Sequence, residues 1–555
     1  MAPPLNYTEL NSSQKRAMAA LIVEDRNVMI LGEAGTGKSA FIWHGCKMYI
    51  DKCVRKGKSC SGTLITAPCG MAASKLKGRT LDSVIPPLTN VTDPHVCATL
   101  VKKLLATNAE RWKFIKLLSI LVIDEVSTLL ATKLKMLDVA FRIIREAPQS
   151  YMGGVRVMLC GDFLQLDAVG DAETTKLFRD EAMLLGEFKV VCLEENLRQS
   201  DQHLSALLSR ARVGRLTSDD NELLLSKSSK HRGEEIESNA LHICGSRNLA
   251  HAINTKRFES LQDVSGSHKF EAVKRWTHGS GDGEWIVKSI DEETPSDLGT
   301  LGERLRDFCS RPCVKDAKNC TLRIGTRVML NRNLYEYKDN RMRNGRLGTV
   351  TEIGNLAEQY GDEPVLSPFT HVIVAFDDDE PGVTVKVAPA VLRHGVATGV
   401  CEVWCMPLVH AWAITVHKAQ GCEVDRLVVH CADLYRPKQL YVAISRCRTL
   451  NGLTLLNYEG SLLCPPAAMD VKFYDAIVRN GGTWDFRDGH PGDNEERCGA
   501  SDKKARRIKA KVVPLNKEAR PCTSAGGAKR SKKRKRAHKD RRVNGKRKVE
   551  EREGM

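Results

Sequence analysis

Short apolar runs separated by amphipathic stretches characterise residues 1–195. The runs VMIL, TLIT, LVID and VMLC are each followed by a loop or by a helical pattern, and residues 133–145 place one apolar face along a helix. Strands that alternate with helices predict a parallel sheet with crossover connections. Similar signals cover residues 197–254 and return between about Pro407 and Val478. The chain is therefore expected to contain two α/β domains with parallel sheets.

The pattern changes between the two parts of the second domain. Residues 322–391 are rich in β-branched residues and glycine, and VML, GTVTEI and HVIVAFDD are the expected strands of a small β-barrel. Residues 260–320 are polar and predict only an irregular insertion. After Gly481 the sequence turns to Gly, Asp, Pro, Lys and Arg, which predicts a disordered tail.

A phosphate-loop pattern, GxxxxGKS, lies between the first apolar strand and a helix. Its glycines let the backbone turn so that amide groups face phosphate oxygens near a helix N-terminus. Lys38 would neutralise the β and γ phosphates of ATP, and the Ser39 hydroxyl would bind Mg²⁺. A chance glycine-rich turn is the alternative, which the flanking strand and helix disfavour. The expected ATP-binding residues are Gly32, Glu33, Ala34, Gly35, Thr36, Gly37, Lys38 and Ser39.

Two later strands end in polar residues that suit ATP hydrolysis. In LVIDEVST, Asp124 is expected to hold Mg²⁺ and Glu125 to orient or deprotonate the attacking water, although an acidic surface turn is the alternative. In VMLCGDFLQL, the neutral amide of Gln165 is placed to sense the γ phosphate. The sequence thus predicts an ATPase, but these residues do not show what the ATP drives.

Charge is concentrated at the C-terminal end of the chain. The formal net charge is +17, and residues 501–555 hold 22 Lys and Arg against six Asp and Glu, a net charge of +16. The run KRSKKRKRAHKDRR, residues 529–542, predicts a nuclear import signal that binds an import receptor, or a sequence-independent DNA tether. A merely solubilising tail is the remaining alternative. Nuclear localisation is therefore expected.

Apolar and cysteine content limit the class of protein further. No apolar run approaches the length of a membrane-spanning helix, and residues 1–26 lack the apolar stretch of a secretory signal, so a soluble protein without a membrane partner is expected. The 19 cysteines are scattered through apolar runs, as free thiols in a reducing compartment would be. Cys309, Cys313 and Cys320 lack paired CxxC spacing, which disfavours a zinc site and leaves the question open.

The order of the motifs resembles the petite-integration-frequency (Pif) DNA helicases, relatives of RecD in helicase superfamily one. LNSSQKRA is similar to the adenine-reading segment of that family, which implies that Gln14 contacts the base. ENLRQSD and YVAISR match its arginine-bearing motifs, which implies that Arg198 and Arg446 reach the γ phosphate. VHKAQG matches a further motif, in which Gly421 would lie at the nucleotide. The span from GTRVMLNRN to NGRLGTV is similar to the family's barrel insertion.

The resemblance also implies a path for single-stranded DNA, entered from a duplex junction and followed from 5′ to 3′. The segments that correspond to the family's strand-contacting motifs are TAPCGMAA, GRTLDSV and VHKAQG. The implied DNA-binding residues are Thr66, Pro68, Gly70, Thr80, His417, Lys418 and Gln420. The implied fold has two RecA-like P-loop domains: residues 1–195 form the first, residues 196–321 begin the second with the irregular insertion, residues 322–400 form the barrel, residues 401–480 complete the second domain, and residues 481–555 are the tail.

Three positions depart from the family pattern. QLDAV stands where the family commonly has QLPPV, TLDSV replaces TLHSF, and Lys438 replaces the glycine that often precedes Gln439. The carboxylate of Asp82 in TLDSV would add negative charge near the strand path and lower DNA affinity. None of these positions belongs to the hydrolytic set, so ATP hydrolysis is a firmer expectation than unwinding.

The expected function is an ATP-dependent DNA helicase in replication, recombination, repair or telomere maintenance, and the sequence leaves both the pathway and the oligomeric state open. A translocase that remodels bound proteins without separating strands is the first alternative. An RNA helicase of the same superfamily is the second.

Overall fold

The computed structural model describes most of the chain up to residue 491. The described residues are 10–57, 62–68, 70–85, 91–107, 112–168, 176–195, 201–229, 240–262, 266–278, 285–334, 342–354, 371–396, 399–460 and 465–491. The predicted disorder of the tail beyond residue 491 and the basic run at residues 529–542 lie outside these residues. All statements below refer to the described residues.

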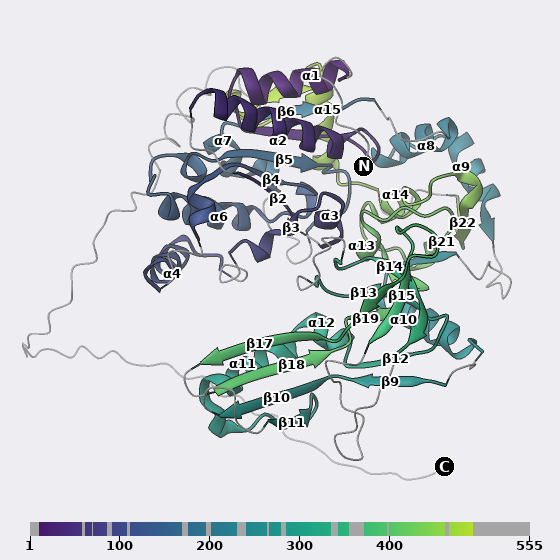
Figure 1. The fold of residues 1–555 in the computed structure, drawn as a ribbon. Coiled ribbons are helices and arrows are strands. Elements are labelled where there is room, and N and C mark those ends of the chain that lie inside the picture. Colours follow the sequence, from purple (N-terminus) through teal and green to yellow (C-terminus); the bar gives the residue numbers. More distant parts are fainter. Residues whose placement is uncertain are drawn as a thin grey trace, which may run out of the picture. The chain divides into compact units, whose positions relative to one another are not determined.

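The first α/β domain is built on a seven-stranded sheet in the order β23-β6-β1-β5-β4-β2-β3 (Figure 1). Every neighbouring pair from β6 to β3 is parallel, as the sequence predicts, whereas β23 is antiparallel to β6. The strands are β1 (Val28–Leu31), β2 (Gly62–Ala67), β3 (Arg79–Thr80), β4 (Leu118–Ile123), β5 (Arg156–Gly161), β6 (Lys189–Cys192) and β23 (Thr483–Asp485).

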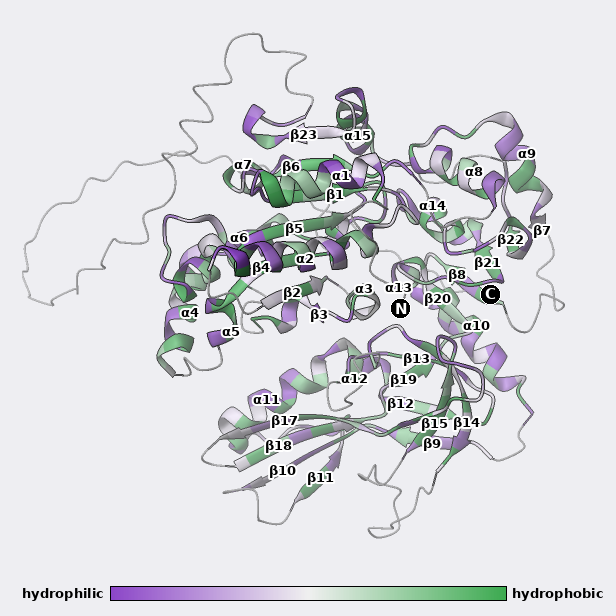
Figure 2. Cartoon of the chain, turned by 45° about the horizontal axis from the view of Figure 1, so that its top comes forward, coloured by the Kyte–Doolittle hydropathy of each residue, from purple (hydrophilic) through white to green (hydrophobic). Residues whose placement is uncertain are grey.

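Helices cover both faces of this sheet, which explains why its central strands are almost entirely apolar. Side chains of α1 and α2 pack against one face, and those of α4, α6 and α15 pack against the other. Figure 2 shows the hydrophobic strands between helices whose outer sides are hydrophilic. The helices are α1 (Ser12–Met18), α2 (Lys38–Arg55), α3 (Gly70–Lys75), α4 (Pro94–Thr107), α5 (Lys113–Lys116), α6 (Ala131–Ile144), α7 (Glu181–Leu185) and α15 (Ala468–Arg479).

The second α/β domain has a five-stranded parallel sheet in the order β20-β8-β21-β22-β7. Its strands are β7 (Ser228–Ser229), β8 (Leu241–Cys244), β20 (Ala413–Thr415), β21 (Leu427–His430) and β22 (Leu453–Leu456), and its helices are α8 (Gln202–Arg212), α9 (Ser218–Ser226), α10 (Arg247–Glu259), α13 (Val416–Ala419) and α14 (Gln439–Ile444). The two parallel sheets confirm the predicted α/β fold.

The strands expected of the barrel are present and form a five-stranded antiparallel sheet, β16-β15-β14-β13-β19. These strands are β13 (Arg327–Leu330), β14 (Leu347–Ile353), β15 (Val372–Phe376), β16 (Val385–Val387) and β19 (Leu408–His410). Closure of this sheet into a barrel stays a prediction.

The expectation of an irregular insertion before residue 322 is wrong. A four-stranded antiparallel sheet, β11-β10-β18-β17, packs against α11, and β9 pairs with β12. These elements are β9 (His268–Glu271), β10 (Val273–His278), β11 (Ile286–Ser289), β12 (Asn319–Leu322), β17 (Ala390–Val396), β18 (Gly399–Cys405), α11 (Gly299–Ser310) and α12 (Pro312–Asp316). The β10–β11 and β17–β18 pairs join strands that are neighbours in the sequence, whereas β10 and β18 lie far apart, so local patterns could not show that the two pairs form one sheet.

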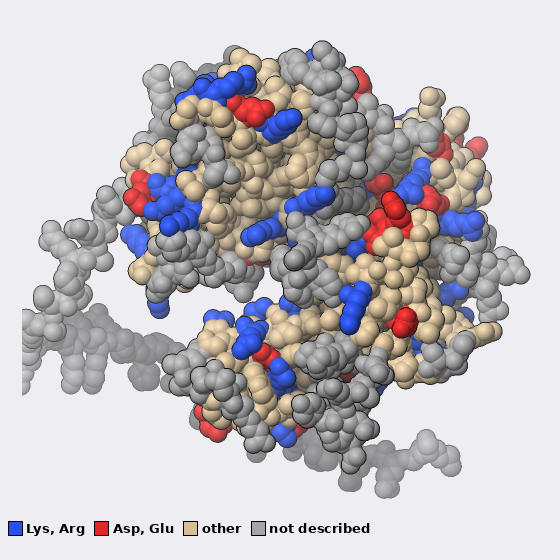
Figure 3. Space-filling view, in the orientation of Figure 1, with Lys and Arg blue, Asp and Glu red and all other residues tan. Residues whose placement is uncertain are grey.

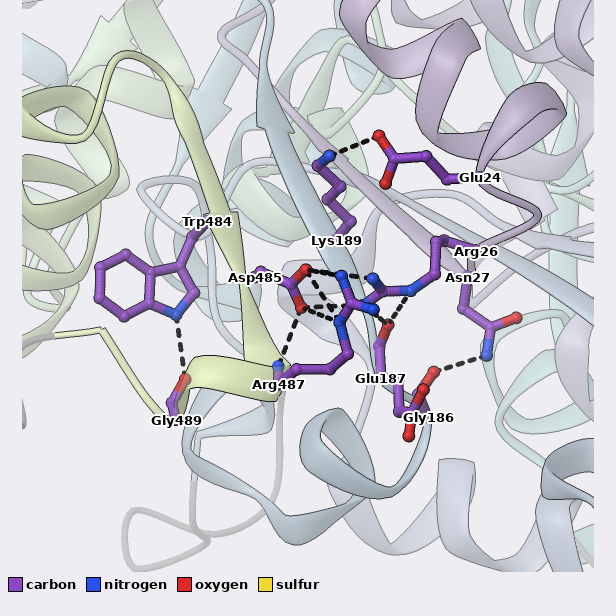
Figure 4. Close-up of polar contacts among 10 residues, drawn as sticks. All are labelled: Glu24, Arg26, Asn27, Gly186, Glu187, Lys189, Trp484, Asp485, Arg487 and Gly489. Carbon is purple, nitrogen blue, oxygen red and sulfur yellow. Dashed lines mark hydrogen bonds and ion pairs between the residues drawn. The ribbon is translucent and has the colours of Figure 1, made fainter. Parts of the chain in front are cut away.

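The boundary predicted at residue 480 is also wrong, because the chain returns to the first domain before that point. Phe473 and Ile477 of α15 belong to the first domain's core, and β23 extends its sheet. Figure 4 shows Arg26 and Arg487 converging on the carboxylate of Asp485. The Arg26 guanidinium donates two hydrogen bonds to this carboxylate, at 2.8 and 3.0 Å. Residues up to 488 therefore complete the first domain.

None of the described helices is long and apolar enough to cross a membrane. Cysteines in the described segments are free thiols, mostly buried, and no three His, Cys, Asp or Glu side chains among them gather as a metal site. The described residues therefore give no support for zinc at Cys309, Cys313 and Cys320.

Candidate nucleotide-binding site

The phosphate loop connects β1 to α2 with the backbone its glycines allow. Gly35 and Gly37 have φ of 93° and 82°, which side-chain-bearing residues rarely adopt. A Cβ on Gly32 would lie 2.5 Å from the Thr36 hydroxyl oxygen, so this position has no room for a side chain. The Lys38 ammonium donates to the carbonyls of Gly32 and Glu33, at 2.7 and 2.8 Å. The lysine is thus held at the loop, beside the amino end of α2, where phosphate groups are best stabilised.

The strand end that carries Asp124 is fixed by a neighbouring strand. The Asp124 amide donates to the Thr66 carbonyl at 2.9 Å, and the Thr66 hydroxyl donates to the Val122 carbonyl at 2.7 Å. Thr66 is fully buried, and its predicted contact with DNA stays a prediction. Thr66 holds the end of β4 in place and so positions Asp124.

Ser39 and Asp124 offer the ligand types that Mg²⁺ prefers. The serine lies in the first turn of α2, and the aspartate follows β4 at the same edge of the sheet. Cys160 lies on β5, between β1 and β4. Burial raises the pKa of its thiol strongly, the Asp124 carboxylate raises this pKa further, and the Lys38 ammonium lowers it. A hydroxyl and a carboxylate beside bound phosphates form a typical magnesium-binding set, so the residues fit this ion.

Glu125 occupies a strained turn that second-domain side chains reach. Its φ is 51°, in the left-handed region that glycine prefers, and strain of this kind is common at functional sites. A Cβ on Gly161 would lie 2.7 Å from the Val126 nitrogen, so β5 packs directly on this turn. The Gln420 amide donates to the Glu125 carboxylate at 3.1 Å. The candidate base is therefore tied to the VHKAQG segment of the second domain.

The turn after β5, residues 162–167, carries Gln165 and is bound by an arginine that the sequence analysis did not single out. Arg212 donates two hydrogen bonds of 2.8 Å to the Asp162 carboxylate, and both side chains are buried. Burial opposes ionisation of Asp162, but the Arg212 guanidinium holds the pKa of Asp162 below its ordinary value. Gln165 is buried within this turn, and its backbone amide donates to the Asp162 carbonyl. The pair therefore fixes the turn that bears the candidate γ-phosphate sensor.

A local signal for Arg212 existed in the sequence. Leu204, Leu208 and Arg212 follow one another at four-residue spacing, which puts the arginine on the apolar side of α8. A charged residue on that side is rarely buried without an ionised partner. Its partner, Asp162, could not be identified from spacing alone.

Helix α8 also contacts the phosphate loop. The Ser209 hydroxyl donates to the Glu33 carboxylate, at 2.9 Å to the nearer oxygen. Burial raises the pKa of Glu33, and the neighbouring Arg212 opposes this shift. The second domain thus reaches the loop as well as the two strand ends.

Arg446 lies just beyond α14 and is held by its own domain. Its guanidinium donates to the Val442 carbonyl at 2.9 Å and to the Ser445 hydroxyl at 2.8 Å. Burial raises the pKa of the nearby Tyr441 phenol, the Asp162 carboxylate raises it further, and the Arg212 guanidinium lowers it.

Of the two remaining predicted nucleotide contacts, Gly421 is described by the structure and Arg198 is not. Gly421 has φ of 90° and follows Gln420 directly. Arg198 lies outside the described residues, and its role at the γ phosphate stays a prediction. The structure brings together the phosphate loop, Asp124, Glu125, Gln165 and Gln420, whereas Arg446 bonds to Val442, Cys422 and Ser445 of its own domain and its role at the γ phosphate stays a prediction.

Gln14 is buried at the start of α1 and suits a role in base recognition. It forms a capping box with Asn11, in which the Gln14 side-chain oxygen accepts a hydrogen bond from the Asn11 amide at 3.2 Å. Its side-chain nitrogen is buried and has no hydrogen-bond partner among the described residues. An amide fixed at its oxygen and free to donate at its nitrogen fits the edge of an adenine ring.

The remaining residues of the implied DNA path are distributed over both domains and the insertion. Pro68 and Thr80 are partly exposed, whereas Gly70 packs under the insertion, because a Cβ there would lie 2.8 Å from the Asn344 Cβ. Lys418 forms an ion pair with Asp316 at 3.6 Å. Burial lowers the pKa of His417, so this imidazole favours the neutral form. The first-domain and second-domain parts of the path stay predictions.

Asp82 does not add an uncompensated charge to this path. Its carboxylate forms an ion pair with Lys133 at 2.6 Å, which removes the reason for expecting a lower DNA affinity. On the face drawn in Figure 3, basic and acidic side chains of the described residues are interspersed over several elements. Charge on that face therefore does not mark a strand path.

Two parallel α/β sheets, a phosphate loop with acidic strand ends, and contacts from the second domain define a two-domain P-loop NTPase. The PIF1-like helicase family model matches residues 9–215, which include the phosphate loop, both acidic strand ends and α8. Over these residues the chain matches the PIF1-like helicase family, as the motif order indicated.

Curated relatives and solved structures are also similar to this chain. The ATP-dependent DNA helicase PIF1 of Xenopus laevis is 26% identical over 454 residues, which cover 81% of this chain and 61% of that protein. The chain thus spans about three fifths of the length of this curated relative. The crystal structure of Pif1 helicase from Candida albicans is similar with a TM-score of 0.64 and 23% identity, over 84% of this chain and 99% of that one. A Bacteroides Pif1 helicase in complex with ADP-AlF3 and ssDNA has a TM-score of 0.61 and 23% identity, over 86% and 99% of the two chains.

Proposed function

We propose that the chain is an ATP-dependent DNA helicase that moves along single-stranded DNA from 5′ to 3′. The observation that carries the proposal is that second-domain side chains contact three separate parts of the nucleotide machinery in the first domain. Ser209 bonds to Glu33, Gln420 bonds to Glu125, and Arg212 pairs with Asp162. Changes at the nucleotide would therefore be felt directly by the domain that shares the implied DNA path.

The mechanism follows from the positions of these residues. Lys38 and the loop amides would bind the phosphates of ATP, and Glu125 would orient and deprotonate the attacking water. Mg²⁺ held by Ser39 and Asp124 would neutralise phosphate charge. Arg446 would stabilise the charge that develops as the γ phosphate leaves. Departure of the phosphate, sensed at Gln165, would release the second domain and shift its hold on the strand.

The comparisons support the DNA substrate and the nucleotide. The Xenopus relative is named an ATP-dependent DNA helicase, and the Bacteroides neighbour was crystallised with ssDNA and ADP-AlF3. The 5′ to 3′ direction and entry from a duplex junction rest on the motif resemblance. Assignment to replication, recombination, repair or telomere maintenance stays open.

A forked-duplex assay tests the proposal. Partial duplexes with either a 5′ or a 3′ single-stranded tail are compared with a two-tailed fork in the presence of ATP. Lys38→Ala serves as the inactive control. We expect strand release from the 5′-tailed duplex and from the fork, by the wild type only. ATP hydrolysis stimulated by DNA without release would instead favour a translocase that remodels bound proteins, and equal stimulation by RNA of the same sequence would favour an RNA helicase.

We further propose that the basic run at residues 529–542 directs the protein to the nucleus through an import receptor. The run also has the charge for a salt-sensitive DNA tether. Deletion of residues 501–555 tests both roles. Unchanged nuclear accumulation of the truncated protein would rule out the import role, and an unchanged salt dependence of DNA binding would rule out the tether.

A further inference from the structure

Lys438 of the second domain is buried in a cluster of first-domain groups. It is the N-cap residue of α14, and its side chain has no exposed surface. Its ammonium contacts the Asp470 carboxylate at 2.5 Å, the Asp167 carboxylate at 2.8 Å and the Phe163 carbonyl at 2.8 Å. A buried ammonium is tolerated only when it is paired and hydrogen-bonded in this way.

Two of these residues are departures from the family pattern noted in the sequence. Asp167 stands in QLDAV in place of a proline, and Lys438 stands in place of a glycine. The two substitutions have opposite charge and meet in one ion pair. Lys438 has φ of 70°, where glycine would be unstrained, so its ionic contacts hold a residue in a conformation that it otherwise disfavours.

The Lys438 contact is the second of two second-domain contacts that fix the turn carrying Gln165. Arg212 binds Asp162 at the start of the turn, and Lys438 binds Asp167 at its end. Between them, Leu166 packs into the hydrophobic core of the second domain. The turn at residues 162–167 is therefore held by both domains, because Phe163 packs in the core of the first domain and Leu166 in that of the second.

We propose that Lys438 is a positioning residue that couples the phosphate-sensing turn to the helix preceding Arg446. Lys438 fixes the start of α14, and Arg446 lies two residues beyond the end of that helix. Movement of the turn when the γ phosphate is lost would thus be passed along α14 to the arginine. This inference rests on the proposed ATP-driven cycle and adds to it a coupling element particular to this chain.

The test compares Lys438→Met with Lys176→Met in the full chain. Lys176 contacts the same two carboxylates, Asp167 at 2.6 Å and Asp470 at 3.4 Å, but it lies in the first domain. It therefore controls for the loss of one positive charge from the cluster. We expect Lys438→Met to lower kcat of DNA-stimulated ATP hydrolysis roughly 100-fold, as a misplaced catalytic group does. The KM for ATP and the affinity for a fluorescent ADP analogue should stay close to wild type, and Lys176→Met should retain kcat.

A double substitution and hydrogen exchange separate coupling from simple destabilisation. Asp167→Asn added to Lys438→Met should cause no further loss, because both changes break the same contact. Amide exchange in the turn at residues 162–167 should increase in Lys438→Met and remain unchanged in Lys176→Met. If Lys438→Met does not fold, Lys438→Gly provides the same test, because glycine accepts the left-handed backbone.

Three results would overturn the inference: wild-type kcat in Lys438→Met or Lys438→Gly, additive losses in the double variant, or the same loss in Lys176→Met. Failure of the proposed function looks different. A wild-type protein without DNA-stimulated hydrolysis contradicts the proposed function. An active wild type with an equally active Lys438→Met contradicts only the coupling role.

Discussion

The side-chain amide of Gln420 donates a hydrogen bond of 3.1 Å to the carboxylate of Glu125, and the two residues lie on different domains. Gln420 belongs to VHKAQG, which the motif resemblance places on the DNA path, whereas Glu125 is the candidate base for water activation. One hydrogen bond therefore connects the expected strand-binding segment to the expected catalytic carboxylate. A shift of the second domain would therefore change the hydrogen bonding of the Glu125 carboxylate.

The first prediction concerns Glu125 itself. Glu125→Gln preserves the size of the side chain and its capacity to pair with Gln420, but it removes the basic carboxylate. We expect turnover to fall by roughly 100- to 10,000-fold, the usual contribution of a general base. Binding of a fluorescent ADP analogue should persist. Steady-state hydrolysis with saturating DNA measures the effect, and near-normal turnover would remove Glu125 from the catalytic set.

The second prediction separates Lys38 from Arg446. Lys38→Ala should abolish hydrolysis, because the loop loses the charge that faces the phosphates. Arg446→Ala should retain nucleotide binding and lower turnover about 1,000-fold, since an arginine of this kind stabilises the transition state. Arg448→Ala is the matched control, because Arg448 is exposed and pairs only at the surface with Asp425. Normal hydrolysis by Arg446→Ala with DNA present would mean that this arginine does not serve the site.

Sequence patterns revealed the parts of the site that are local. The phosphate loop, the acidic ends of β4 and β5, and the VHKAQG and YVAISR segments each carry their chemistry within a few residues. The structure adds interactions whose partners lie far apart. Lys438 and Asp167 are separated by 271 positions, and Arg26 and Asp485 by 459. No periodicity within one segment could have identified such pairs.

The same limit explains the errors in domain boundaries. β23 completes the sheet of the first domain by pairing with β6, whose residues precede it by almost the whole second domain. β10 likewise pairs with β18, although β13, β14, β15 and β16 of the five-stranded sheet lie between them in the sequence. Thr66 shows the same limit, because no local pattern could reveal that its hydroxyl donates to the Val122 carbonyl of the neighbouring strand.

The third prediction tests the buried pair of Arg212 and Asp162. Arg212→Met leaves a buried carboxylate without its bidentate partner, which we expect to destabilise the protein by about 3–5 kcal/mol. Adding Asp162→Asn should recover much of this loss, because the uncompensated charge is removed. Thermal unfolding by circular dichroism measures both variants. Arg215→Met is the control, since Arg215 is 61% exposed in its pair with Asp475, and a loss equal to that of Arg212→Met would contradict the buried-pair explanation.

The last prediction uses pH to test whether the Asp485 ion pair holds β23 on the sheet of the first domain. Burial alone would raise the pKa of Asp485, but hydrogen bonds from Arg26 and Arg487 hold it well below the ordinary carboxyl value. A carboxylate with a depressed pKa in the folded state stabilises the fold above its unfolded pKa of about 4, and this contribution is lost as the pH falls further.

Asp485→Asn should therefore lower the melting temperature at pH 7 and make progressively less difference below pH of about 4, where the wild-type carboxylate also loses its advantage. Asp488→Asn is the control, because Asp488 is exposed in the same short segment. Melting curves of the three proteins across this pH range provide the measurement. A difference between wild type and Asp485→Asn that stayed constant as the pH fell would show that the pair with Arg26 does not fasten β23 to the first domain.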